Sequence, residues 1–226
     1  MTQQLNWTVS QQTEQHNSSM SKSGAEQEML CAFLQSPDIL AQMDVICIGT
    51  VGSAGAAILA EEKQEALAEK FSPKFLRQAK QNAQDVEACR EIISEAAVAD
   101  ESDECGLTQL GSGGIFQGLW NLAEAAGVGL EIVLSQIPIK QETIEICNFY
   151  LVNPYELQSA GCYLMLSRQG YRTVARLQKL GICANVIGMT MDNKDRVVLY
   201  DGERRFLVKR YRDAIEQIQR KERKHK

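Results

Sequence analysis

Short apolar segments alternate with helix-like segments along most of the chain, and this alternation limits the folds that it can adopt. Predicted strands are short, apolar and bounded by glycine or polar residues: 44–49, 130–134, 162–167, 184–191, 196–200 and 206–208. Predicted helices cover 56–71, a segment starting at Ser72-Pro73, 85–99, 115–126, 141–149 and 169–180. This order, with hairpin-like strand neighbours within 184–208, predicts α+β layers rather than a continuous βαβ winding.

The two ends of the chain differ from its body in composition. Residues 1–23 are polar and predict a disordered tail, and 24–43 predict a helical lead-in. From residue 204 to the end there are ten Lys/Arg and three Asp/Glu, a local charge of +7. The whole chain carries −5, so the first 203 residues carry −12. Residues 209–226 predict a basic helix. Two interpretations of its basic end, Arg220–Lys226, stay open: a solvated, frayed helix terminus or an electrostatic docking tail.

Several classes of protein are excluded by what the body contains. It is acidic, which argues against nucleic acid or an anionic membrane as partners. The two histidines, His16 and His225, lie at the ends, so no Ser-His-Asp or Cys-His catalytic centre is expected. The seven cysteines form no Cys-x-x-Cys pair, so no metal site is predicted. Without a signal peptide or an apolar membrane segment, the sequence predicts a cytoplasmic protein.

Two glycine-rich loops are the candidate binding sites. The first is Gly111, Ser112, Gly113 and Gly114, which lead into the helix from Ile115 and leave free N–H groups for a phosphate. It matches no named phosphate motif, because Lys and Ser/Thr are missing from the Walker positions. The secondary candidates are Gly49, Gly52, Ser53 and Gly55. For both loops a purely structural tight turn stays open, and no catalytic residue is predicted.

Seven segments resemble the C-terminal domain of aminoimidazole ribonucleotide (AIR) synthetase relatives, and most of all the AIR-synthase-related hydrogenase maturation factors. These segments are Asp44–Glu62, Gly113–Ile132, Ile137–Cys147, Leu151–Gly161, Val186–Gly188, Asp195–Val198 and Glu203–Leu207. The resemblance implies one domain over 44–208 with three α/β/α layers and a mixed β-sheet. It also implies a phosphate-binding turn at 111–114.

The same resemblance exposes differences from the family. The family's N-terminal domain supplies acidic metal and ATP contacts and builds the dimer, whereas only about 43 residues precede the resembling region here. The family turn reads Asp-Val-Thr-Glu-Gly-Gly, whereas Gln109 and Ser112 replace its two acids in this chain. In the opening loop, Gly49, Thr50 and Ala54 replace lysine, tryptophan and glutamate.

Three functions remain open on this basis. The favoured one is a non-catalytic AIR-synthase-like domain that binds a phosphate-bearing ligand or a protein partner. The second is an ATP-dependent enzyme of hydrogenase-maturation or purine type, using ATP and Mg²⁺ only when a partner supplies the missing N-terminal domain. The third is a purely structural interaction module. Self-association into a homo-oligomer is compatible with each of them.

Overall fold

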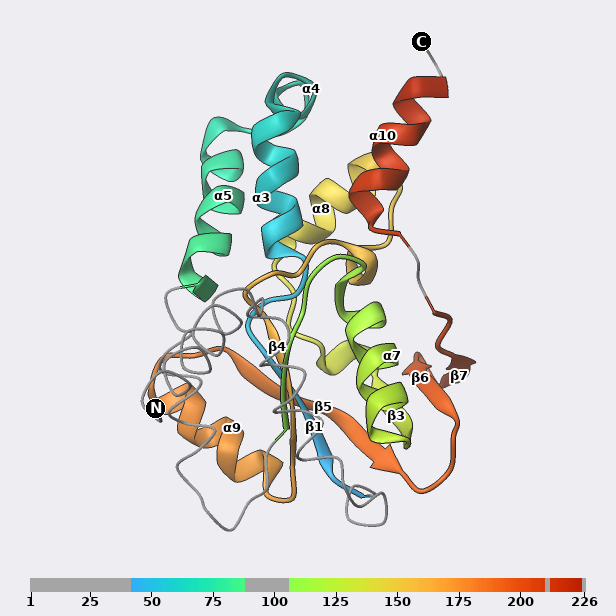
Figure 1. Cartoon of the computed structure of the whole chain (residues 1–226). Helices are drawn as coiled ribbons and strands as arrows, with labels where there is room; N and C mark the ends of the chain where they lie inside the picture. Colours follow the sequence, from blue (N-terminus) through green and yellow to red (C-terminus); the bar gives the residue numbers. More distant parts are fainter. Residues whose placement is uncertain (1–41, 88–105, 210–211, 225–226) are drawn as a thin grey trace, which may run out of the picture.

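The computed structural model describes residues 42–87, 106–209 and 212–224 (Figure 1). The predicted polar tail, the helical lead-in and most of 85–99 lie outside these residues. The strands are β1 (Asp44–Ile48), β2 (Gly106–Gln109), β3 (Gly129–Val133), β4 (Tyr163–Ser167), β5 (Ala184–Met191), β6 (Arg196–Tyr200) and β7 (Glu203–Phe206). The helices are α3 (Ser53–Glu62), α4 (Gln64–Ala68), α5 (Pro73–Glu87), α7 (Gly114–Ala126), α8 (Gln141–Tyr150), α9 (Gly170–Lys179) and α10 (Ala214–Lys224), with 3-10 turns η2 (Leu134–Gln136) and η3 (Pro154–Glu156).

The strands form one mixed sheet of seven, in the order β2-β4-β1-β5-β3-β6-β7. Among the strands that the structure describes, only the β3–β6 pair is parallel. The expected hairpin-like neighbours within 184–208 are partly wrong, because β3 lies between β5 and β6 and pairs with both. The buried side chains of Leu130 and Ile132 explain this position, since an interior strand hides apolar side chains better than an edge strand does.

The sheet is packed on both faces, and the alternation of side chains along β1 shows how. Val45 and Cys47 pack with the buried residues of α7. Ile46 and Ile48 point to the other face and pack with Val174 and Leu177 of α9. Successive side chains of a strand point to opposite faces, so four consecutive apolar residues supply both cores. The fold therefore has the three α/β/α layers and the mixed sheet that the resemblance implied.

A second group of helices caps one end of the sheet. Figure 1 shows α3, α5, α8 and α10 together beyond this end. Their shared core contains Leu59, Leu67, Ile146 and Ile218, which are buried. Glycine is required in this contact at Gly55, whose added Cβ would lie 2.4 Å from the side chain of Leu157.

The helix α10 packs on the rest of the fold, whereas the two interpretations of the basic end at 220–226 stay open. Ala214 and Ile218 of α10 are buried against α3 and α8. Lys63 pairs with Glu222 at 2.6 Å, and the Lys221 ammonium donates to the Leu151 carbonyl at 3.1 Å. An apolar stripe on an otherwise charged helix gives it a face to bury, so α10 packs against α3 and α8.

Other elements differ from expectation in smaller ways. The predicted helix over 56–71 is two helices, α3 and α4, that meet at Lys63. The predicted serine cap is confirmed, since the Phe75 N–H donates to Ser72 Oγ at 3.3 Å. The strand β2 is not among the predicted strands, and its Leu107 pairs with Met165 of β4. In the part of the chain that the structure describes, every helix is too short or too polar to cross a membrane.

Candidate functional site

The first glycine loop connects β2 to α7, and its shape is set by contact with another part of the chain. Gly113 and Gly114 have φ values of 80° and 64°, the left-handed region that glycine adopts most easily. A Cβ on Gly114 would lie 2.5 Å from the carbonyl oxygen of Tyr155 and 2.7 Å from that of Leu157. Gly114 is therefore needed so that the backbone from Tyr155 to Leu157 can pass close to the turn.

The N–H group that was expected to face a phosphate already has an anionic partner. The Gly113 N–H donates to Asp213 Oδ2 at 2.8 Å. Asp213 is only 4% exposed, and its other oxygen, Oδ1, accepts from the N–H of Ile215 at 2.9 Å. One carboxylate thus caps the start of α10 and also lies at the start of α7, where the helix dipole favours negative charge. The anion position of the turn is filled from within the chain.

The other groups of this turn are also engaged or exposed. The Gly114 N–H donates to the Gly111 carbonyl at 3.2 Å, and the same carbonyl accepts from the Ser159 N–H at 3.1 Å. Ser112 is exposed, and its hydroxyl is available to solvent. Of the four predicted residues, Ser112 alone offers a side chain to a ligand from outside.

The second glycine loop, between β1 and α3, is tied to the same segment. The Gly52 N–H donates to Ser159 Oγ at 2.9 Å, and the Gly55 N–H donates to the Gln158 carbonyl at 2.9 Å. Ser53 is buried, and its hydroxyl lies 2.8 Å from Thr50 Oγ1. Two loops that are about 60 residues apart in sequence are thus brought together by Ser159.

Two buried carboxyl residues next to this assembly were not predicted. Asp213 is one, and Glu156 of η3, which is 5% exposed, is the other. Glu156 accepts from the side-chain amide of Asn153 at 2.9 Å and from that of Gln217 at 3.4 Å, so it also joins η3 to α10. A signal for Asp213 was present, because Asp just before a run with helical periodicity is a typical N-cap. The sequence has no comparable signal for Glu156.

The chemistry available near the loops is limited. Burial raises the pKa of the Cys162 thiol to about 12, and the thiol donates to the Thr50 carbonyl at 3.2 Å. Burial also raises the pKa of Cys47 well above its usual range. Both thiols are neutral at physiological pH and are poor nucleophiles. Among the described residues, no group of three or more His, Cys, Asp or Glu side chains could hold a metal ion.

Comparisons with known proteins agree with this architecture. The family model described as "AIR synthase related protein, C-terminal domain" matches residues 43–201. The structure of E. coli HypE, a hydrogenase maturation protein, is 21% identical, with a TM-score of 0.63 over 81% of this chain and 55% of that one. A HypE–HypF complex is 17% identical, with a TM-score of 0.57 over 74% and 53% of the two chains.

A structure of HypE in complex with ATP is 16% identical, with a TM-score of 0.57 over 76% of this chain and 52% of that one. This chain therefore spans about half the length of the solved structures that it matches. At these identities the likeness shows a shared fold. No curated protein sequence matches the chain.

Proposed function

The chain belongs to the family of AIR synthase related proteins, by the C-terminal domain of that family, and from this premise we propose that it is a non-catalytic member that works by binding a protein partner. The observation that carries this proposal is the bond from the Gly113 N–H to the carboxylate of Asp213. A phosphate at the turn would have to displace a buried carboxylate of the same charge. Release of Asp213 would also remove the cap of α10.

The residues around the turn support the same conclusion. Gln109 and Ser112 stand where the resemblance predicts two acids, and a Mg²⁺–nucleotide complex needs carboxylate or water oxygens to balance its charge. The neighbours in the fold include HypE with ATP and HypE with HypF. Of these two kinds of ligand, a nucleotide would compete with Asp213 at the turn, whereas a protein can bind elsewhere on the surface.

The direct test follows the amide resonance of Gly113 in ¹⁵N-labelled full-length protein during titration with inorganic phosphate and with Mg-ATP. We expect the Gly113 resonance of the wild type to stay unchanged, because Asp213 holds this N–H. The same titrations of Asp213→Ala provide the matched comparison, and we expect phosphate to shift the resonance there, because the N–H has lost its partner. A saturable shift of wild-type Gly113 with either ligand would overturn the proposal in favour of phosphate binding.

A further inference from the structure

The edge strand β7 offers backbone and side chains to solvent in an arrangement suited to binding. All four residues of β7, Glu203–Phe206, are exposed. Among the described residues, β7 pairs with β6 and with no other strand. Figure 1 shows the β6–β7 hairpin at the margin of the molecule, away from α9. An open strand edge is a template for pairing with another extended chain.

The register of the β6–β7 pair fixes which backbone groups of β7 are free. The Leu207 N–H donates to the Arg196 carbonyl across the hairpin at 2.8 Å. In an antiparallel pair, alternate residues of a strand bond to the same neighbour, so Arg205 and Glu203 also face β6. The N–H and C=O groups of Arg204 and Phe206 therefore point outward, away from the sheet.

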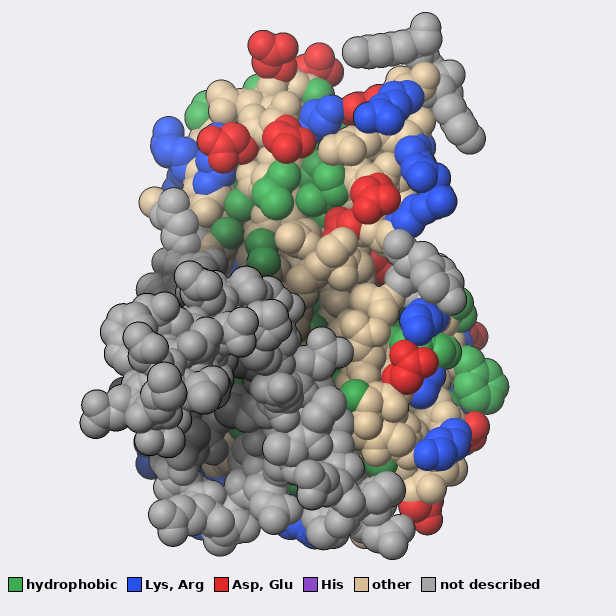
Figure 2. Space-filling view, viewed as in Figure 1, with side chains coloured by type: hydrophobic (Ala, Val, Ile, Leu, Met, Phe, Trp, Pro, Cys, Tyr) green, Lys and Arg blue, Asp and Glu red, His purple; other side chains and the backbone are tan. Residues whose placement is uncertain are grey.

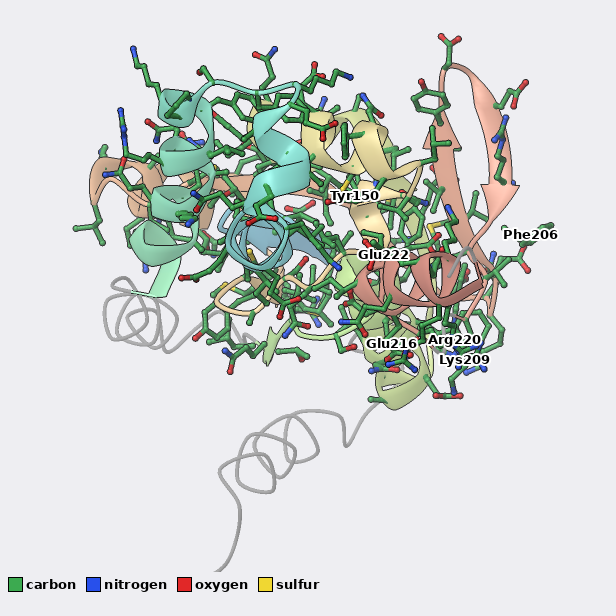
Figure 3. The ribbon with its side chains drawn as sticks, turned by 90° about the horizontal axis from the view of Figure 1, so that it is seen from above. Tyr150, Phe206, Lys209, Glu216, Arg220 and Glu222 are labelled. Atoms are coloured by element: carbon green, nitrogen blue, oxygen red, sulfur yellow. The ribbon has the colours of Figure 1, made fainter. Side chains whose placement is uncertain are left out.

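A cavity with aromatic walls lies beside this edge. Its volume is about 330 Å³, and its lining includes Phe116, Tyr155, Tyr200, Arg205, Phe206 and Val208. The rings of Phe116 and Tyr155 stack with their centroids 5.4 Å apart and form a rigid wall. Phe206 is 73% exposed and points away from the ribbon in Figure 3. The cavity has room for one apolar side chain of a bound segment.

The charge on β7 selects between possible occupants. Arg205 pairs with Glu203 at 2.6 Å, but both side chains are about two-thirds exposed, and Arg204 lies 4.0 Å from Glu131. Exposed pairs of this kind are weak and exchange partners readily. Figure 2 shows basic, acidic and hydrophobic side chains next to one another over this edge. The strand β7 carries two arginines and one glutamate, so two copies of it would each carry a net positive charge, whereas an acidic strand would carry the opposite charge.

We propose that β7 binds an extended, acidic segment of a partner protein, which adds as an eighth strand and places an apolar side chain in the cavity. Main-chain bonds to Arg204 and Phe206 supply affinity. The cavity and the two arginines supply specificity. This inference rests on the proposed function, since it names the surface by which a protein-binding domain would hold its partner.

The test begins with a displayed library of random short peptides, selected against the full-length chain. We expect selected sequences in which acidic residues alternate with bulky apolar ones. Synthetic copies are then measured by fluorescence anisotropy against wild type, Arg204→Ala and Arg204→Pro. Alanine removes the side chain and keeps the outward N–H, whereas proline removes both and fits an edge strand whose N–H faces solvent. We expect proline to weaken binding by about tenfold or more relative to alanine.

A second measurement does not depend on the folding of any variant. N-methylation of alternate peptide bonds in a selected peptide should abolish binding in one register and spare it in the other, because alternate residues of an added strand face β7. Failure to select any peptide, selection of basic peptides, or equal binding to the alanine and proline variants would overturn the proposal. The proposal would also be overturned if the wild-type chain dimerises and Arg204→Pro abolishes the dimer, because the occupant of the edge would then be a second copy of the chain.

The two proposals fail in different ways. If phosphate shifts wild-type Gly113 while acidic peptides still bind at β7, the proposed function is wrong and the surface stands. If the Gly113 resonance does not shift and selected peptides bind equally well to Arg204→Pro, the proposed binding surface at β7 is wrong and the proposed function stands.

Discussion

Replacing Asp213 by alanine tests whether this carboxylate holds the glycine turn and α10 together. The change leaves two N–H groups without their acceptor, that of Gly113 at 2.8 Å and that of Ile215 at 2.9 Å. A hydrogen bond to a charged group contributes about 1.5–3 kcal/mol, and loss of an Asp cap costs about 0.5–2 kcal/mol. We therefore expect the free energy of unfolding to fall by about 2–5 kcal/mol, a large part of the about 5–15 kcal/mol typical of a domain.

The measurement is urea unfolding followed by circular dichroism, with Asp213→Asn and Asp192→Ala made in parallel. Asparagine keeps one carbonyl oxygen of the two acceptors, so it should lose less stability than alanine does. Asp192 is exposed, and its replacement should change stability by less than about 0.5 kcal/mol. The reasoning is refuted if Asp213→Ala unfolds within about 0.5 kcal/mol of the wild type, because both N–H groups would then be equally well satisfied by water.

Three further predictions concern the turn and the thiols. Gly114→Ala places a Cβ 2.5 Å from a carbonyl oxygen and should lower the free energy of unfolding by about 2–5 kcal/mol, measured by thermal unfolding. The Cβ of Gly111→Ala meets nothing within 4 Å, so this control should lose far less stability. Equal losses for the two variants would contradict the prediction. Because burial raises the pKa of Cys147 to about 12, the unfolded chain ionises this thiol first. Stability should therefore fall from about pH 8.5 upward, by up to about 1.4 kcal/mol per pH unit, and Cys147→Ala should remove that share of the slope in urea titrations. Iodoacetamide should label the exposed Cys183 before the buried Cys47 in peptide mass mapping, and the reverse order would show that the strand ends open.

Local signals in the sequence predicted most helix ends and strands correctly. Ser72-Pro73 marked the start of α5, and Gly127, which has φ 65°, marked the end of α7. These features are local because a cap or a left-handed glycine acts on residues within one turn. The elements that were misjudged depend on distant partners. The strand β2 is short and polar in part, and its pairing with β4 decides its conformation.

The position of the glycine turn was predicted, and its use as a binding site stays a prediction. The four residues at 111–114 do lie at the start of a helix, as their glycine content indicated. What fills the turn was not predictable, since Gly113 and Asp213 are 100 residues apart in sequence. The contact of Gly114 with the backbone from Tyr155 to Leu157 was also not predictable. A glycine that makes room for a phosphate and a glycine that makes room for another part of the backbone look the same in a sequence.

The sequence by itself determined most of the elements and the family likeness, because hydrophobic periodicity and capping act within a few residues. The tertiary structure alone decided the order of the strands, the docking of α10 and the anion that occupies the glycine turn. Each of these depends on which distant side chains reach one another once the apolar faces are buried. The carboxylate at the start of α10 reaches the phosphate-like turn at α7 only after α7 has packed on the sheet and α10 on α3 and α8.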